Sequence, residues 1–235
     1  EIYTLSLHDA LPICDPELIT LKGLNTLQKA DIIYCPATQG KHGIISRATD
    51  ILKAIEVDES LIHPFILPMS KERTDALNAY NELFLDAQAE YLKGKQIVIV
   101  AEGDAGFYSS IQYVYDKFEE AGIPVDRIAG IPAFIAAGAL AGIHIVKQEE
   151  QINVIPGTAS FDELSAKIEN GMIIVIMKLP GCQEAIHTCI RQYADKAVFH
   201  YFENVGTGKE YYTTDITIIH SKDFPYFSLL IVQPR

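Results

Sequence analysis

The run Gln96-Ile97-Val98-Ile99-Val100-Ala101, followed at once by Glu102-Gly103-Asp104, decides the fold of this chain. The run is almost entirely apolar, is rich in β-branched side chains and shows no alternation between apolar and polar residues. That pattern is typical of a parallel strand covered on both faces. A helical pattern over Ser109–Ala121 follows and ends at Gly122. A buried strand that leads through a short polar loop into a helix is typical of an open α/β sheet, in which ligands bind at the carboxyl ends of the strands.

Toward the N-terminus, the residue pattern predicts further helices and strands. Asp15 can cap a helix that has Pro16 at its first position and leucines at helical spacing behind it. A short apolar run that meets a proline is typical of a strand that ends there. The predicted elements are a helix over Asp15–Ala30, a strand over Asp31–Pro36, and helices over Ile44–Ile55 and Ser70–Lys93.

Toward the C-terminus, the pattern changes near His144 and becomes richer in strands. We therefore expect an α/β fold of two α/β subdomains, residues 15–128 and 129–235, with a ligand-binding cleft between them. The predicted strands are Val125–Ile131, Gln151–Ile155, Met172–Leu179, Ala197–Phe202, Tyr211–His220 and Phe227–Val232, and the predicted helices are Phe134–Ala141, Phe161–Asn170 and Cys182–Ala194.

The composition excludes several classes of protein. The chain has 235 residues, of which 49% are hydrophobic and 21% charged, and these are globular values. The formal net charge of −12 and the lack of a basic stripe argue against a nucleic-acid-binding protein. The longest apolar stretch, Ile131–Val146, is too short and too interrupted to span a membrane, so we expect it to be buried inside the protein.

The cysteines favour a reducing compartment. Cys14, Cys35, Cys182 and Cys189 form no CxxC pair, and the spacing of His187 between the last two matches no familiar zinc pattern. Reduced cysteines in a cytosolic protein are the favoured interpretation, ahead of a disulfide framework or a metal site. The chain also begins without a basic segment of the secretory type. We therefore expect a cytoplasmic protein without a bound metal.

The loop after the central strand has two interpretations. Gly103 lacks a Cβ, which lets the backbone approach a ligand closely. Asp104 can accept a hydrogen bond from a ribose hydroxyl or an amine of a ligand. It can equally cap the following turn in an ordinary strand–loop–helix unit. These residues alone leave both interpretations open.

Five segments of the chain resemble motifs of the tetrapyrrole methylase family, and they follow one another in the same order as in that family. The central one, Val98–Ser110, resembles the Gly-Asp loop of that family. The resemblance covers Asp15–Arg235 and implies two α/β subdomains with a cofactor cleft. The other four segments are Asp15–Gly23, Gly130–Phe134 with Ala141–Ile143, Val175–Lys178, and Glu203–Thr207.

The resemblance implies a binding site for S-adenosyl-L-methionine. For Met177, plain packing in the core is an equally good interpretation of the residue itself. The family also suggests a homodimer. The positions implied to contact the cofactor are Gly103, Asp104, Phe107, Pro132, Ala133, Met177 and Gly206.

Two further segments, Pro68–Lys71 and Pro225–Val232, resemble the branch of the family that methylates C-20 of precorrin-2 or its cobalt form. The resemblance therefore implies methyl transfer in corrin (cobalamin) biosynthesis. A methylase for another tetrapyrrole position or for a diphthine precursor is the alternative within the family. A non-catalytic S-adenosylmethionine-binding module is the alternative from another class.

A tetrapyrrole substrate with many carboxylates needs a local basic cluster on an acidic protein. Five basic residues from loops and helix starts of the first subdomain are candidates for it: Lys41, His42, Arg47, Lys71 and Arg73. Asp15 and Tyr108 are expected near the substrate, although a helix cap and a packing role explain each of them more simply. No general base is predicted.

The start of the chain departs from the family pattern. The family has a strand that ends in a Gly-x-Gly-Pro-Gly turn, whereas this chain reads Leu11-Pro12-Ile13-Cys14 before Asp15. Residues 1–14 are interpreted as a foreign or artefactual segment, similar to translated sequencing-adapter sequence, which resequencing of the source locus would test. Ile2–Leu7 is still expected to form a strand at the vacant edge of the sheet. Loss of the glycines predicts weakened activity.

Overall fold

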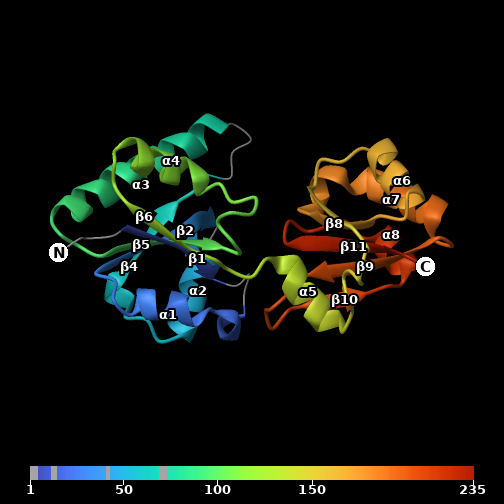
Figure 1. Cartoon of the computed structure of the whole chain (residues 1–235), viewed down its shortest axis with the longest axis horizontal. Coiled ribbons are helices and arrows are strands. Elements are labelled where there is room, and N and C mark those ends of the chain that lie inside the picture. The colour runs from blue at the N-terminus through green and yellow to red at the C-terminus, as the bar shows by residue number, and fades with distance from the viewer. Residues whose placement is uncertain (1–4, 12–14, 41–42, 69–72) are drawn as a thin grey trace. The chain divides into compact units, whose positions relative to one another are not determined.

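The computed structural model describes residues 5–11, 15–40, 43–68 and 73–235 (Figure 1). The chain divides into two compact units, Glu1–Pro132 and Ala133–Arg235, which we call unit 1 and unit 2. The predicted limit between the subdomains lies a few residues earlier, after residue 128. Each unit has its own sheet and its own hydrophobic core, so each is described by itself.

Unit 1 alternates strands with helices along most of its length, as the sequence predicts. Its elements are β1 (Leu5–Leu11), η1 (Pro16–Leu18), α1 (Leu21–Leu27), β2 (Ile32–Gly40), β3 (Gly43–Ile45), α2 (Arg47–Ala54), η2 (Glu59–Leu61), β4 (Ile62–Ile66), α3 (Arg73–Leu92), β5 (Ile97–Glu102), α4 (Gln112–Glu120) and β6 (Val125–Ile128).

The sheet of unit 1 is mostly parallel and has helices on both faces. Its strand order is β3-β2-β5-β1-β6, and β4 also pairs with β2. Only the pairing of β2 with β3 is antiparallel. Figure 1 shows α3 and α4 on one face of the sheet and α1 and α2 on the other. All five parallel strands therefore end at the same edge, which is where the loop after β5 lies.

Strand β5 confirms the prediction for the apolar run. Ile97 and Ile99 belong to one buried cluster, together with Phe118 of α4. Val98 and Val100 belong to a second cluster, together with residues of α2 such as Leu52. Because successive side chains of a strand point to opposite faces, a strand covered on both faces needs apolar residues at every position.

Strand β1 pairs in parallel with β5 on one side and β6 on the other. The prediction of a strand in this part of the chain is confirmed, but its predicted end and its predicted place in the sheet are wrong. The strand continues to Leu11, beyond the predicted end at Leu7, and it occupies the interior of the sheet rather than an edge. Residues 2–4 lie outside the described residues. An interior place lets both sides of the strand form backbone hydrogen bonds. Ile13 and Cys14, at the expected glycine positions, lie outside the described residues.

Three N-terminal predictions need correction. The expected helix over Asp15–Ala30 is interrupted, because the Thr20 hydroxyl accepts from the Gly23 N–H and starts a new helix, α1. Pro36 does not end β2, which continues to Gly40 by pairing with β4 and then β3. The expected helix over Ile44–Ile55 starts only after Ser46, whose hydroxyl caps α2 through the Thr49 N–H.

Unit 2 has five strands, against six in unit 1, and fewer parallel pairs. Its elements are α5 (Ala133–Ala141), β7 (Ile152–Pro156), α6 (Phe161–Glu169), β8 (Ile173–Met177), η3 (Leu179–Cys182), α7 (Gln183–Tyr193), β9 (Ala197–Glu203), β10 (Tyr211–Thr213), α8 (Ile216–Ser221) and β11 (Ser228–Pro234).

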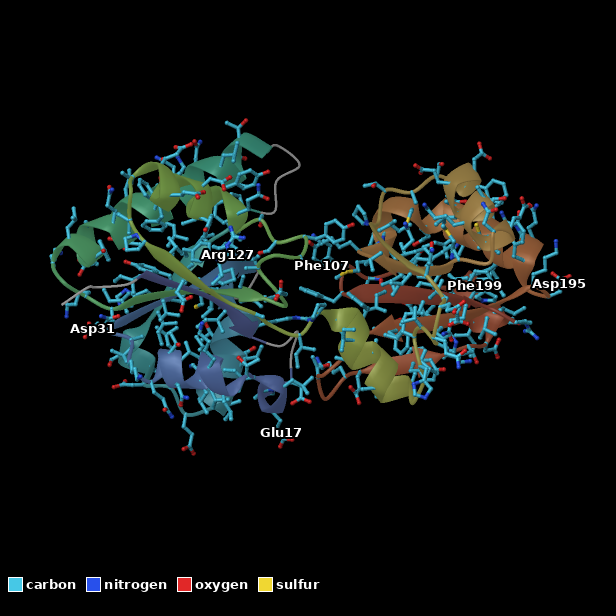
Figure 2. The ribbon with its side chains drawn as sticks, viewed as in Figure 1. Glu17, Asp31, Phe107, Arg127, Asp195 and Phe199 are labelled. Carbon is cyan, nitrogen blue, oxygen red and sulfur yellow. The ribbon has the colours of Figure 1, made fainter. Side chains whose placement is uncertain are left out.

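The sheet of unit 2 has the order β10-β9-β11-β8-β7, in which only β7 and β8 are parallel neighbours. The helices α6 and α7 pack on one face, and α5 lies on the opposite side of the sheet (Figure 1). The core beneath α6 and α7 joins Leu164, Ile186 and Phe199. Phe199 points from β9 into this layer (Figure 2).

Two C-terminal predictions are wrong in part. The segment Tyr211–His220 is a strand only to Thr213, because the Asp215 carboxylate accepts from the backbone N–H groups of Thr217 and Ile218 and starts α8. The stretch Ile131–Val146 is not buried throughout, since Ile135 of α5 is 48% exposed. Among the described residues, none of the helices combines the length and the hydropathy that crossing a membrane requires.

Candidate functional site

The loop that follows β5 departs from ordinary backbone geometry at both ends. Gly103 has a φ of 95°, which a residue with a side chain rarely adopts, and Tyr108 has a φ of 54°. Gly103 itself is buried at the carboxyl end of β5. The glycine is therefore required here by the turn of the chain, whatever the loop binds.

The Asp104 carboxylate organises this loop. Its Oδ1 accepts from the Gly106 N–H at 2.9 Å, and its Oδ2 accepts from the Gly130 N–H at 2.8 Å. Gly130 follows β6, and β1 lies between β5 and β6 in the sheet. Asp104 thus joins two loops across the end of β1, and its turn-forming role is confirmed. Each oxygen keeps a second lone pair for a ligand, so cofactor contact by Asp104 stays a prediction.

Phe107 and Tyr108 form an aromatic surface on the same loop. Their ring centroids lie 4.9 Å apart in an edge-to-face arrangement. Phe107 is partly buried and projects from the loop (Figure 2), while Tyr108 is 47% exposed. Two adjacent rings beside a glycine turn, one partly buried and one exposed, provide an apolar face for a flat ligand. This arrangement is compatible with the predicted contact of Phe107 with the cofactor.

Glu102, the last residue of β5, was not among the predicted site residues. Its side chain is partly buried, and this burial raises the pKa of the carboxyl group above its usual value of 4.5. The positive charge of Arg47 in α2 acts in the opposite direction and lowers that pKa. The sequence signal was available, because Glu102 is the one ionisable residue between the apolar run and Gly103.

The predicted pair Pro132 and Ala133 marks the division of the chain. Pro132 is the last residue of unit 1, and Ala133 is the first residue of unit 2 and of α5. Pro132 is partly buried, and Ala133 is 5% exposed. Their contact with a cofactor stays a prediction.

Met177 ends β8 and pairs with Leu229 of β11 and with Pro156 of β7. Its side chain is only partly buried, unlike the four preceding residues of β8. Glu203 at the end of β9 pairs with Ser228, the first residue of β11. Met177 and the loop that carries Gly206 therefore lie at the same edge of the sheet of unit 2.

The backbone after β7 touches the backbone after β8. A Cβ placed on Gly157 would lie 1.8 Å from the Lys178 carbonyl oxygen, and one on Gly181 would lie 2.1 Å from the Gly157 carbonyl oxygen. Lys178 itself has a φ of 61°. Sequence reasoning missed both glycines, because the contact joins residues that are distant in the chain.

The loop after β9 is held by several hydrogen bonds. The Asn204 N–H donates to the Phe227 carbonyl at 2.9 Å, and the Gly206 N–H donates to Glu210 at 3.1 Å. Gly206 has a φ of 79°, so the glycine is required by this turn. Just before the loop, the Glu203 carboxylate accepts from Lys222 at 2.5 Å. The predicted cofactor residue Gly206 thus lies in a loop of defined shape.

The predicted substrate residues are less well assembled. Asp15 accepts from the Glu17 N–H at 2.9 Å and caps η1, in agreement with its simpler predicted role. Arg73 begins α3 and Arg47 begins α2. Lys71, with Lys41 and His42, lies outside the described residues. The basic cluster therefore stays a prediction.

The described cysteines are buried free thiols. Burial raises the pKa of Cys182 to about 11 and that of Cys189 to about 12, and it also raises the pKa of Cys35. A thiol with a raised pKa is a poor nucleophile near neutral pH. Over the described ranges, no group of three His, Cys, Asp or Glu residues is placed to hold a metal ion.

Comparison with known proteins identifies the family. Residues 10–217 match the model of the tetrapyrrole (corrin/porphyrin) methylases. The chain is 30% identical to the precorrin-2 C(20)-methyltransferase of a Sinorhizobium species, over 93% of this chain and 90% of that protein. It is also 30% identical to the probable cobalt-precorrin-2 C(20)-methyltransferase of Methanocaldococcus jannaschii, over 73% of this chain and 71% of that protein.

A solved structure shows the same fold. The uroporphyrin-III C-methyl transferase of Thermus thermophilus, complexed with S-adenyl homocysteine, superimposes with a TM-score of 0.65 at 15% identity. The match covers 98% of this chain and 97% of that one. The family model and the relatives agree along most of the chain, so this protein belongs to the tetrapyrrole methylase family.

Proposed function

We propose that this protein transfers a methyl group from S-adenosyl-L-methionine to C-20 of precorrin-2 or its cobalt form, in corrin (cobalamin) biosynthesis. The observation that carries the proposal is the similarity to a precorrin-2 C(20)-methyltransferase over 90% of that protein's length. Family membership alone supports the reaction class, whereas this relative supports the position on the ring.

The residues at the two sheet edges fit such a cofactor. When bound, S-adenosyl-L-methionine supplies a methyl group that its sulfonium already activates. In unit 1, Gly103 leaves room for the backbone to approach the cofactor, and Asp104 holds the loop while keeping lone pairs free. In unit 2, Met177 and Gly206 are proposed to contact the adenosine part.

The protein's main task in this reaction is alignment. An activated methyl group and an electron-rich bridging carbon react once they are held in line, and such positioning can supply roughly 7–11 kcal/mol of the barrier at best. The hydrogen bonds from Gly106 and Gly130 to Asp104 serve this task because they fix two loops relative to each other. Phe107 and Tyr108 provide an apolar surface that excludes water from the reacting atoms.

The test measures binding and turnover separately. Calorimetry with S-adenosylhomocysteine measures the affinity of the cofactor site. Incubation with S-adenosylmethionine and either precorrin-2 or cobalt-precorrin-2, followed by mass spectrometry and NMR of the product, identifies the methylated position. We expect a new methyl group at C-20. A methyl group at another ring position would contradict the proposal and favour the alternative tetrapyrrole methylases.

A non-catalytic binding module is the second candidate. It is favoured by one observation, that Leu11-Pro12-Ile13-Cys14 stands where the family has a glycine-rich turn. Binding of S-adenosylhomocysteine without any methyl transfer would support this candidate. Replacing Ile13 and Cys14 by glycine should then restore turnover, because a tight turn leaves no room for side chains.

We also propose a homodimer in the cytoplasm. The family resemblance supports the dimer, and the buried free thiols Cys35, Cys182 and Cys189 fit a reducing compartment. Light scattering coupled to size-exclusion chromatography would measure the mass of the assembly against the 26.1 kDa chain.

A further inference from the structure

Glu102 stands apart from the other carboxylates of unit 1 by its position. It is the last residue of β5 and lies directly before Gly103, at the edge where the parallel strands end. Val98 and Val100, on the same face of the strand as Glu102, pack against α2. The Glu102 side chain is partly buried on that face, where Arg47 of α2 provides the opposite charge.

The other two carboxylates predicted near the site, those of Asp104 and Asp15, already accept hydrogen bonds from backbone N–H groups. Both oxygens of Asp104 accept backbone N–H groups, those of Gly106 and Gly130. Asp15 accepts from the Glu17 N–H and caps η1. Hydrogen bonds to the ionised form of a carboxylate weaken it as a base. Within the described ranges, no hydrogen bond is formed to the carboxylate of Glu102, so its oxygens are open to a ligand.

Polar groups of β2, α2 and the segment between them form hydrogen bonds with one another. The Cys35 thiol of β2 lies 3.2 Å from the Thr49 hydroxyl, and the Ser46 hydroxyl donates to the Pro36 carbonyl at 2.7 Å. Among the described residues, the charge that acts on the Glu102 carboxyl group is that of Arg47 of α2. Burial raises the pKa of Cys35 and keeps this thiol neutral.

We propose that Glu102 is a catalytic residue, whose carboxylate accepts the proton that leaves C-20 of the tetrapyrrole. The inference rests on the proposed function. In the balanced reaction, the C-20 electrons form the bond to the methyl carbon, and the sulfur–methyl bond breaks with its electron pair on sulfur. The C-20–H bond then breaks, its electron pair restores the conjugated ring, and the proton moves to a Glu102 oxygen.

The position of Glu102 on a strand suits this role. A base on a central strand is held more rigidly than one on a loop. A carboxyl group whose pKa is raised by burial is also a stronger base than an exposed one. Arg47 limits that rise, because its positive charge favours the ionised form of the carboxyl group.

The test compares Glu102→Gln with the parent chain and with Glu120→Gln, which removes an exposed carboxylate from the end of α4. We expect Glu102→Gln to lower the single-turnover rate of methyl transfer about 100-fold or more, the usual contribution of a positioned base. Its affinity for S-adenosylhomocysteine should stay unchanged. Glu120→Gln should behave as the parent in both measurements.

Two further readouts separate a base from a structural residue. The parent rate should fall at acidic pH as Glu102 takes up a proton, with a midpoint above 4.5, and Glu102→Gln should lack this limb. Carbon-13 NMR of glutamate-labelled protein should show one carboxyl resonance, absent from Glu102→Gln, that titrates above 4.5 and moves when precorrin-2 is added.

The outcomes are distinguishable. If the parent chain transfers methyl to C-20 and Glu102→Gln keeps its rate and pH profile, the role of Glu102 is wrong and the proposed function stands. A Glu102 resonance that ignores precorrin-2 bound to the parent chain overturns the role in the same way. If the parent chain transfers no methyl group to any tetrapyrrole, the proposed function fails and this inference fails with it.

Discussion

The loops at the sheet edges of the two units are held by different means. In unit 1, a side chain joins them: the Asp104 carboxylate accepts the N–H groups of Gly106 and Gly130. In unit 2, backbone meets backbone, because Gly157 leaves no room for a Cβ against the Lys178 carbonyl. The first contact depends on the chemistry of one side chain, and the second depends on the absence of one.

This difference has consequences for tolerance to mutation. A hydrogen bond can be partly restored by an isosteric side chain, and its loss costs about 0.5–3 kcal/mol, depending on charge. A contact between two backbones cannot be restored by any L-residue with a side chain, because the added carbon overlaps atoms that belong to a β-strand end. We therefore expect unit 2 to be the less tolerant of the two at its sheet edge.

The largest effect is expected for Gly157→Ala. The added Cβ would lie 1.8 Å from the Lys178 oxygen and 2.9 Å from the Met177 oxygen, so the backbone after β8 must move. We expect the free energy of unfolding to fall by about 3 kcal/mol or more. Urea unfolding followed by circular dichroism measures this. Gly208→Ala is the matched control, since its Cβ meets no atom within 4 Å, and equal effects of the two would refute the backbone contact.

The next effect is expected for Asp104→Ala. Removal of the carboxylate leaves the Gly106 and Gly130 N–H groups without their partner, which should cost about 2 kcal/mol and weaken binding of S-adenosylhomocysteine. Asp104→Asn keeps one acceptor oxygen and should lose about half as much. Asp116→Ala, an exposed position in α4, serves as control. If Asp104→Ala matches the control in stability and in affinity, Asp104 does not organise the loop.

A smaller effect is expected for Asp215→Ala, a side-chain anchor in unit 2. Asp215 accepts from the backbone N–H groups of Thr217 and Ile218 and starts α8. Loss of such a cap costs about 1 kcal/mol, which thermal unfolding can measure. Asp195→Ala, at an exposed position between α7 and β9, provides a comparison outside a cap. An Asp215→Ala cost as large as that of Gly157→Ala would remove the distinction between the two kinds of contact.

The smallest effect concerns pH, and the two units should respond in opposite directions. Burial and the charges of His220 and Arg191 lower the pKa of His187 in unit 2 below its usual 6.5. The unfolded chain then binds the proton more readily, so His187 contributes stability above pH 6.5 that is lost as the pH falls. Burial raises the pKa of Glu102 in unit 1 above 4.5, so its contribution is lost as the pH rises through that raised value.

Hydrogen exchange resolved by segment can test this, between about pH 5.5 and about pH 7.5 after correction for the intrinsic rates. Protection of α7 should decrease on acidification, and His187→Phe should abolish part of the decrease. His144→Gln, an exposed histidine of the same unit, should leave it unchanged. The expectation fails if α7 loses protection equally in all three chains.

Prediction from sequence succeeded where the cause was local. The apolar run of β5 lies where it was expected, and so does the helix predicted over Phe161–Asn170, which is α6. Prediction failed where a capping side chain started a new helix inside a segment whose spacing indicated a single element. Tyr211–His220 alternates like a strand, yet Asp215 starts a helix within it. Asp15–Ala30 has helical spacing, yet Thr20 divides it.

In the candidate site, too, local features could be predicted from the sequence, whereas contacts between distant residues could not. The strand–loop–helix with Gly103 and Asp104 was predicted because periodicity and turn chemistry act over a few residues. The cofactor role of these two residues was implied only by the resemblance to the family. The partner of Asp104 at Gly130 and the contact of Gly157 with Lys178 had no such signal. They arise because pairing brings the ends of β5, β1 and β6, and likewise those of β7 and β8, to one edge of a sheet. Hydrogen bonds and backbone contacts between such ends depend on strand order, which residue patterns along the chain do not encode.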